Sequence, residues 1–180
     1  MTVGLELYSY LRDKKINTGF VATGQVGITV TGNGIPLDAY KLDHACGAVE
    51  TAVVEQKDKD IIIVEGQGSI LHPGSTATLP LMRGTCPTHM ILCHIARNTT
   101  IRSFEKIKIP DLKKFIELNE NLATVIGTYP KAKVAGVALN TTLMSKEDAE
   151  HYIEIVEKET GIPATDVIRF GGDRIFSQLL

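Results

Sequence analysis

The sequence predicts an α/β protein with a mostly parallel sheet and helices on both of its faces. Short β-favouring apolar runs alternate along the chain with longer segments of helical periodicity, which is typical of a parallel sheet covered by helices. Glycine, proline and capping residues stand where one element should end and the next begin. The chain has 180 residues, of which 43% are hydrophobic and 22% charged. This length suffices for one core, and we expect residues 1–180 to form a single domain.

Four apolar runs are predicted strands, at residues 18–23, 60–65, 89–95 and 133–139. The run DIIIVE at 60–65 is the clearest, because successive β-favouring apolar residues suit a strand that is buried on both faces. A short fifth strand is expected near residues 165–168.

Five segments are predicted helices, each from an apolar face or a start signal. Val3, Leu7, Tyr10 and Leu11 share one face of the opening helix, and Asp43 is the expected N-cap of a helix over 43–56. Asp111 is the expected N-cap of the next helix, whose apolar stripe runs from Leu112 to Val125 and Ile126. Ser145 and Asp148 form the capping box of a helix that Gly161 and Pro163 end, and a last helix starts at Asp173.

Composition and charge exclude several classes of protein. Nineteen Lys and Arg against twenty-one Asp and Glu give a net charge of −2, scattered along the chain, which argues against nucleic-acid and membrane-surface binding. No apolar run approaches the roughly 18 residues of a transmembrane helix, and the first residues do not resemble a signal peptide. The three cysteines form neither a disulfide framework nor a CxxC site. We expect a cytoplasmic protein that acts on a small molecule.

Three loops are expected to carry the chemistry, because ligands of an open parallel sheet bind at the carboxyl ends of its strands. The loops are TGQVGITVTGNG at 23–34, EGQGSILHPGS at 65–75 and NTT at 140–142. Glycine lets backbone N–H groups approach an anion, and glutamine offers both a donor and an acceptor. We therefore predict that Gly24, Gln25, Gln67 and Gly68 contact a bound cofactor; the alternative is that these glycines only form turns.

Three side chains are candidate catalytic groups. Glu65 closes an apolar strand before Gly-Gln-Gly, a position suited to holding Mg²⁺ or positioning a nucleophile beside phosphates; the alternative is a solvated strand-end carboxylate. His72 lies in the same loop and could act as a general acid or base, although a surface histidine is an equal alternative. Asp43 shares a helical face with Glu50, which suits paired carboxylates or simply a solvated face.

A zinc site is disfavoured. Cys93 and His94 are neighbours on a predicted strand, so their side chains point to opposite faces. Together with Cys86 and His89 they lack the paired spacing of a closed zinc site.

Several segments together resemble one family: TGQVGI, DHACGAVE, VEGQGSILHPG, KVAGVALNT and GIPATDVIR. They resemble the C-terminal domain of the D-glutamate N-acetyltransferase-like proteins across essentially the whole chain. This resemblance implies a P-loop NTPase fold, related to dethiobiotin synthetase and the cobyric-acid-synthase amidoligases.

The resemblance also implies roles for individual residues. Glu65 matches the acid of the second-strand EGxG motif, a Mg²⁺ ligand or catalytic group, and Asn140 matches the asparagine that reads adenine. Thr2 matches the hydroxyl residue after the Walker A lysine, which would hold Mg²⁺ together with Glu65. His44 departs from the pattern, because the family usually has an aromatic residue there.

The sequence departs from the family most at the phosphate loop, because it contains no GxxxxGK motif. We therefore expect a fold that lacks its first strand and phosphate loop, so that flanking strands lose a hydrogen-bonded partner. Either the chain is part of a longer protein or another chain fills the gap, and a homo-oligomer is expected.

Three functions remain open at this point. The first is N-acetyl transfer from acetyl-CoA to an amine, with Glu65, His72 or Asp43 as the base. The second is an ATP- and Mg²⁺-dependent ligase of the dethiobiotin-synthetase or amidoligase type. The third is a non-catalytic nucleotide-binding module.

Overall fold

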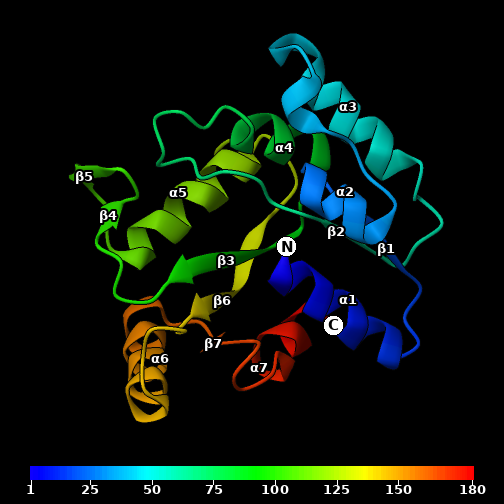
Figure 1. The fold of residues 1–180 in the computed structure, drawn as a ribbon. Helices are drawn as coiled ribbons and strands as arrows, with labels where there is room; N and C mark the ends of the chain where they lie inside the picture. The colour runs from blue at the N-terminus through cyan, green and yellow to red at the C-terminus, as the bar shows by residue number, and fades with distance from the viewer. The chain divides into compact units, whose positions relative to one another are not determined.

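A computed structural model describes all residues, 1–180, and confirms the α/β class with parallel sheets (Figure 1). The chain divides into two compact units, Met1–Cys86 (unit 1) and Pro87–Leu180 (unit 2). Each unit has a parallel sheet of its own. The expectation of a single domain stays a prediction.

Unit 1 is built on two parallel strands. Its elements are α1 (Thr2–Asp13), β1 (Thr18–Val21), α2 (Gln25–Thr31), a 3₁₀ turn (Leu37–Ala39), α3 (Leu42–Val54), β2 (Ile61–Val64) and α4 (Thr78–Thr85). The strands pair in register from Thr18 opposite Ile61 to Val21 opposite Val64. Helix α1 packs against both strands, and α3 packs against α4.

The packing of unit 1 follows from its apolar pattern. Leu7 and Leu11 of α1 are buried, as the predicted helical face requires. The ring of Phe20 in β1 meets Tyr8 of α1 edge to face, with 5.9 Å between ring centroids. Ala45 and Val49 of α3 form a core cluster with Leu37.

The two edges of this sheet differ. On the free side of β1, the side-chain amides of Asn33 and Gln56 both donate to the Phe20 carbonyl at 3.1 Å, and Ile35 N donates to Ala22 O. No strand of residues 1–180 pairs with the other edge of β2. That a neighbouring strand has been lost, and that a partner chain or second copy fills this edge, stay predictions.

Unit 2 has a three-stranded parallel sheet in the order β3–β6–β7. Its elements are β3 (His89–Ile95), β4 (Thr100–Ile101), β5 (Phe104–Lys108), α5 (Leu112–Thr124), β6 (Lys133–Asn140), α6 (Lys146–Thr160), β7 (Ala164–Thr165), α7 (Asp173–Phe176) and a closing 3₁₀ turn (Ser177–Leu179). No strand pairs with the outer edge of β3. The antiparallel pair β4–β5 is a feature that the sequence did not predict.

The central strand β6 is buried along six successive residues. Val137 and Leu139 pack in a cluster with α5 and α6. At Gly136, a Cβ would lie 2.6 Å from Ile175 Cβ of α7, so this position admits no side chain. Helices therefore cover β6 closely, which explains the continuous apolar run KVAGVAL.

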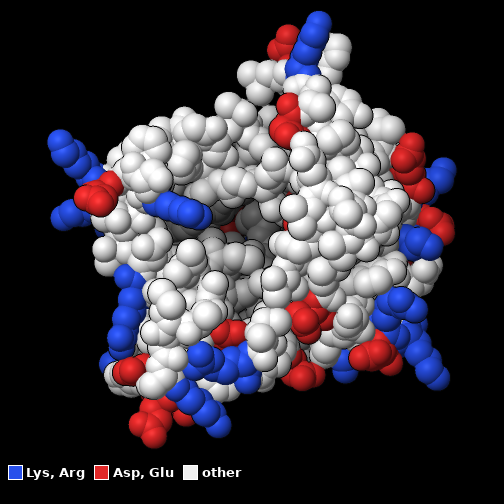
Figure 2. Space-filling view, in the orientation of Figure 1, with Lys and Arg blue, Asp and Glu red and all other residues white.

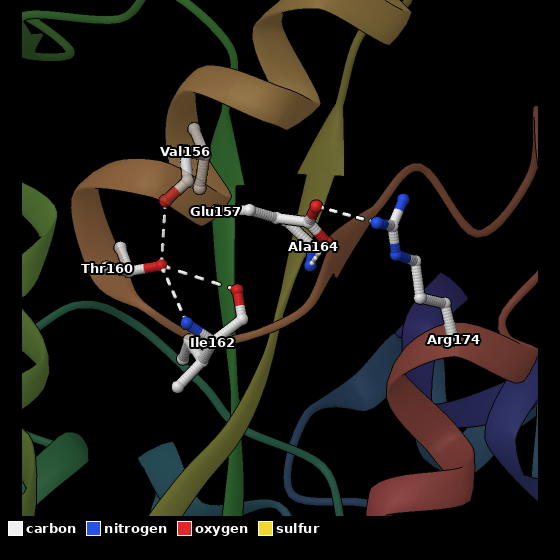
Figure 3. Close-up of polar contacts among 6 residues, drawn as sticks. All are labelled: Val156, Glu157, Thr160, Ile162, Ala164 and Arg174. Atoms are coloured by element: carbon white, nitrogen blue, oxygen red, sulfur yellow. Dashed lines mark hydrogen bonds and ion pairs between the residues drawn. The ribbon is translucent and has the colours of Figure 1, made fainter.

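Hydrogen bonds and an ion pair of polar side chains stabilise the connection from α6 to β7 (Figure 3). Glu157 Oε1 accepts a hydrogen bond from Ala164 N at 2.8 Å, and Oε2 pairs with Arg174 Nη2 at 2.7 Å. The hydroxyl of Thr160 donates to Val156 O at 2.7 Å, which satisfies a carbonyl of the last helical turn. Gly161 then adopts φ +75°, as predicted for the residue after the helix.

Three local predictions were wrong. Asp43 is not an N-cap: Lys41 is, without a side-chain bond, and Asp43 lies in the first turn, where its charge favours the helix dipole. The predicted loop 23–34 contains α2, which Gly32 ends at φ +70°. Val125 and Ile126 lie beyond α5 in left-handed conformations, and Ile126 is exposed; a periodic apolar pattern does not reveal where the backbone leaves the helix.

Positive and negative side chains are mixed on the face shown in Figure 2, so neither sign of charge dominates it. Lys and Arg side chains lie among Asp and Glu side chains along the rim of that face. None of the helices combines the length and the apolar character needed to cross a membrane.

Candidate functional site

The carboxyl end of β2 holds Glu65 firmly in unit 1. Its backbone N donates to Val21 O at 2.9 Å, and its carbonyl accepts from the buried Thr23 hydroxyl at 2.9 Å. Its side chain lies against Gly27 of α2, where any Cβ would collide with Glu65 Oε2. The backbone and the carboxylate are thus both positioned by the segment 23–27.

The start of α1 lies beside the same carboxylate. The Met1 amine is 3.2 Å from Glu65 Oε1, and Thr2 is the first residue of the helix. Glu65 Oε2 is buried and has no hydrogen-bond partner. A buried carboxylate oxygen with no partner suits Mg²⁺, so Glu65 fits the expected metal site, and the part of Thr2 in that site stays a prediction.

These two residues would supply only part of a coordination sphere. No group of three or more His, Cys, Asp or Glu side chains that could hold a metal exists in the chain. Mg²⁺ commonly takes its remaining ligands from substrate phosphates and water.

Gln67, Gly68 and His72 line a common cavity of about 670 Å³ in unit 1. Gln67 Oε1 is buried without a hydrogen-bond partner and points towards Gly24, where a Cβ would lie 3.3 Å away. Gly68 adopts φ +72°, and a Cβ there would collide with Ser75 Oγ. Glycine is therefore required at Gly68 for two reasons, conformation and space.

The loop around His72 consists of consecutive tight turns. His72 N donates to Ser69 O and Ser75 N donates to His72 O, both at 2.9 Å. Gly74 N donates to His72 Nδ1 at 3.1 Å. In a neutral imidazole only one nitrogen accepts, so Nε2 carries the proton and His72 acts as a hydrogen-bond donor in this arrangement.

Five predicted residues of this unit are not among those that line the cavity: Thr2, Gly24, Gln25, Asp43 and Glu65. Asp43 is exposed on α3, and Gln25 is exposed at the first position of α2. The adjacent Gly24 is the N-cap of α2 in an extended conformation. Of the predicted residues of this unit, the structure brings Gly24 close to Gln67, and it places Gln67, Gly68 and His72 along one cavity.

The three cysteines are free, as expected. Burial raises the pKa of the Cys46 thiol, and the nearby Glu50 carboxylate raises it further. A thiol that resists ionisation is a poor nucleophile.

Asn140 lies at the end of β6 in unit 2. Its Oδ1 accepts hydrogen bonds from Thr142 N at 3.1 Å and Thr142 Oγ1 at 2.7 Å. The side chain is exposed, so its amide NH₂ presents donors to solvent. Donors suit the ring-nitrogen acceptors of a base, although this oxygen already has partners within the loop.

A buried network holds the Asn140 loop against the segment after β7. Asp166 Oδ2 accepts from Thr141 N at 2.9 Å and Thr141 Oγ1 at 2.6 Å, while Oδ1 accepts from Ile168 N and Arg169 N. The Arg169 guanidinium donates to Thr141 O and to Met144 O. Burial alone would raise the pKa of Asp166, but these hydrogen bonds outweigh it and lower the pKa below its usual value.

Sequence reasoning missed Thr23, Thr141, Asp166 and Arg169 as positioning residues. The segment GIPATDVIR contributed to the family resemblance, but no role was predicted for its aspartate, Asp166. An aspartate directly after a short buried strand is the signal that could have pointed to this network.

The chain matches the family model described as the domain of unknown function DUF1611_C, a P-loop domain, over residues 1–176. Two curated relatives called D-glutamate N-acetyltransferase are similar, one from Pseudoalteromonas sp at 32% identity and one from Tritonibacter scottomollicae at 33%. Each comparison covers 99% of this chain and 54% of the relative. The crystal structure of a DUF1611 family protein from Anabaena variabilis ATCC 29413 matches with a TM-score of 0.96 and 42% identity, covering 99% of this chain and 52% of that one. The chain thus spans about half the length of these relatives.

Proposed function

The chain belongs to the DUF1611 P-loop domain family, and on this premise we propose that the protein transfers an acetyl group from acetyl-CoA to the amine of a D-amino acid such as D-glutamate. The two relatives called D-glutamate N-acetyltransferase support the proposal. The observation in the structure that supports it most is a cavity lined by Gln67 and His72, beginning two residues after the carboxylate of Glu65.

The reaction requires a base and a group that stabilises negative charge. The acceptor amine must lose a proton before it attacks the thioester carbonyl; the C–N bond then forms, the C–S bond breaks, and the sulfur of CoA leaves as a thiolate that takes up a proton. His72 lines the cavity, where its ring would hydrogen-bond to the developing oxyanion. Glu65, with an oxygen that has no partner, suits the base.

Purified protein, incubated with acetyl-CoA and a panel of D- and L-amino acids, tests the proposal through thiol release and the mass of the product. Glu65→Gln should lower the rate by about a hundredfold or more, the usual contribution of a positioned base. Glu6→Gln removes an exposed carboxylate of α1 and is the matched control. If no amino acid releases CoA, the proposal is wrong.

A second candidate function is an ATP- and Mg²⁺-dependent ligase. It is favoured by Glu65, whose unpartnered carboxylate oxygen would hold the metal. Bound Mg²⁺ would neutralise charge on transferring phosphates. Phosphate release that requires both Mg²⁺ and an acid substrate, without CoA, would favour the ligase over the acetyltransferase.

A further inference from the structure

The cavity of unit 1 is poor in charge. Its lining contains one carboxylate, Asp38, and neither Lys nor Arg. The lining residues are Leu37, Asp38, Tyr40, Leu42, Ala45, Gln67, Gly68, Ser69, His72, Gly74, Ser75, Thr76, Ala77 and Pro80. The lining therefore consists mainly of apolar side chains and of uncharged hydroxyl and amide groups.

This lining does not suit the acidic part of an amino acid such as D-glutamate. Two carboxylates need cations or several N–H donors when they leave water. The cavity offers no cationic side chain of Lys or Arg, and the carboxylate of Asp38 would repel them. The carboxylates of the acceptor would therefore have to be held by other groups.

An uncharged chain with amide groups suits the cavity better. The pantetheine arm of acetyl-CoA has two amides, a hydroxyl and a branched apolar segment, and it carries no charge. The side chains of Gln67, Ser69 and Thr76 give the lining amide and hydroxyl groups with which such an arm can form hydrogen bonds. The volume of about 670 Å³ lies within the range of small-molecule sites.

We propose that this cavity binds the pantetheine arm of acetyl-CoA, whose amides and hydroxyl meet the uncharged polar groups of the lining. The proposal rests on the acetyltransferase function and specifies which of the two substrates enters the cavity. His72 lines the same cavity and is therefore within reach of a bound arm.

Titration calorimetry on the intact protein, with pantetheine and pantothenate as probes, tests the proposal. The two probes share one end, but pantothenate carries a carboxylate where pantetheine continues as a neutral amide. Pantetheine should bind at least about tenfold more tightly than pantothenate, because Asp38 opposes the added charge. Asp38→Asn should narrow this difference, because it removes the charge that repels the carboxylate of pantothenate.

Two tryptophan variants locate the binding. Thr76 is exposed and lines the cavity, so Thr76→Trp should weaken pantetheine binding by about tenfold or more. Val54→Trp adds the same ring at an exposed position of α3 outside the lining and should leave binding unchanged. Failure of the wild type to bind pantetheine, equal binding by Thr76→Trp, or displacement of pantetheine by D-glutamate would overturn the proposal.

Failure of this proposal can be told from failure of the proposed function. Acetyl transfer without pantetheine binding in the cavity would refute the inference and leave the activity standing. Pantetheine binding in the cavity without acetyl transfer to any amine would uphold the inference and refute the activity.

Discussion

Replacing Asp166 with alanine should strongly destabilise unit 2. The carboxylate is 6% exposed and accepts four hydrogen bonds, two of them from Thr141. Alanine would leave the buried N–H and hydroxyl of Thr141 without an acceptor, at about 1–3 kcal/mol each. Because all four bonds share one carboxylate, their energies do not add, and we expect a total loss of about 3–4 kcal/mol at pH 7.

Urea denaturation of the intact protein, followed by circular dichroism, measures this loss. Leu143→Ser, at a side chain that is 97% exposed, is the control and should stay within about 0.5 kcal/mol of the wild type. A loss below about 1 kcal/mol for Asp166→Ala would show that the loops hold together without the carboxylate, and would refute this reasoning.

The same carboxylate predicts a pH dependence. Its folded-state pKa is lowered, so its contribution is complete above the unfolded pKa of about 3.9 and is lost as the pH falls through the folded value. The difference in stability between wild type and Asp166→Asn should therefore be constant from pH 7 to about pH 5 and shrink below about pH 4. A difference that persists unchanged to pH 2 would exclude ionised Asp166 as the cause.

Three further substitutions test the packing and the helix ends by urea denaturation. Gly84→Ala should cost about 1–3 kcal/mol, because the added Cβ would lie 2.6 Å from Val49 Cβ at the contact of α3 with α4; a neutral effect would mean that the two helices separate freely. Ser145→Ala should cost about 1 kcal/mol through loss of the N-cap bond to α6, and Ser145→Asp should restore most of it. Glu157→Ala should cost about 1–3 kcal/mol, because Ala164 N loses its acceptor; an unchanged midpoint would show that water replaces the carboxylate.

The local elements of the fold could largely be predicted from the sequence. The runs DIIIVE and KVAGVAL contain the strands β2 and β6. Consecutive β-favouring apolar residues are typical of a strand that is covered on both faces. Ser145 and Gly161 mark the ends of α6, since both act through bonds or conformations within a few residues.

The candidate site could be predicted only in part. Glu65, Gln67, Gly68 and His72 were found because they follow one strand directly and share one loop. No sequence pattern separates Asp43 from them, and only the course of α3 places its side chain outside the cavity lining. The pattern also could not reveal that His72 Nδ1 is occupied by a backbone N–H, which decides the role that its ring can take.

The sequence by itself determined the α/β class, the strands and the family, because alternation, capping and motif spacing are properties of neighbouring residues. Tertiary structure decided which distant groups meet. Gly27 makes room for the Glu65 carboxylate across 38 positions, and Asp166 binds Thr141 across 25. Such pairings follow from the register and packing of whole elements, which no local pattern records.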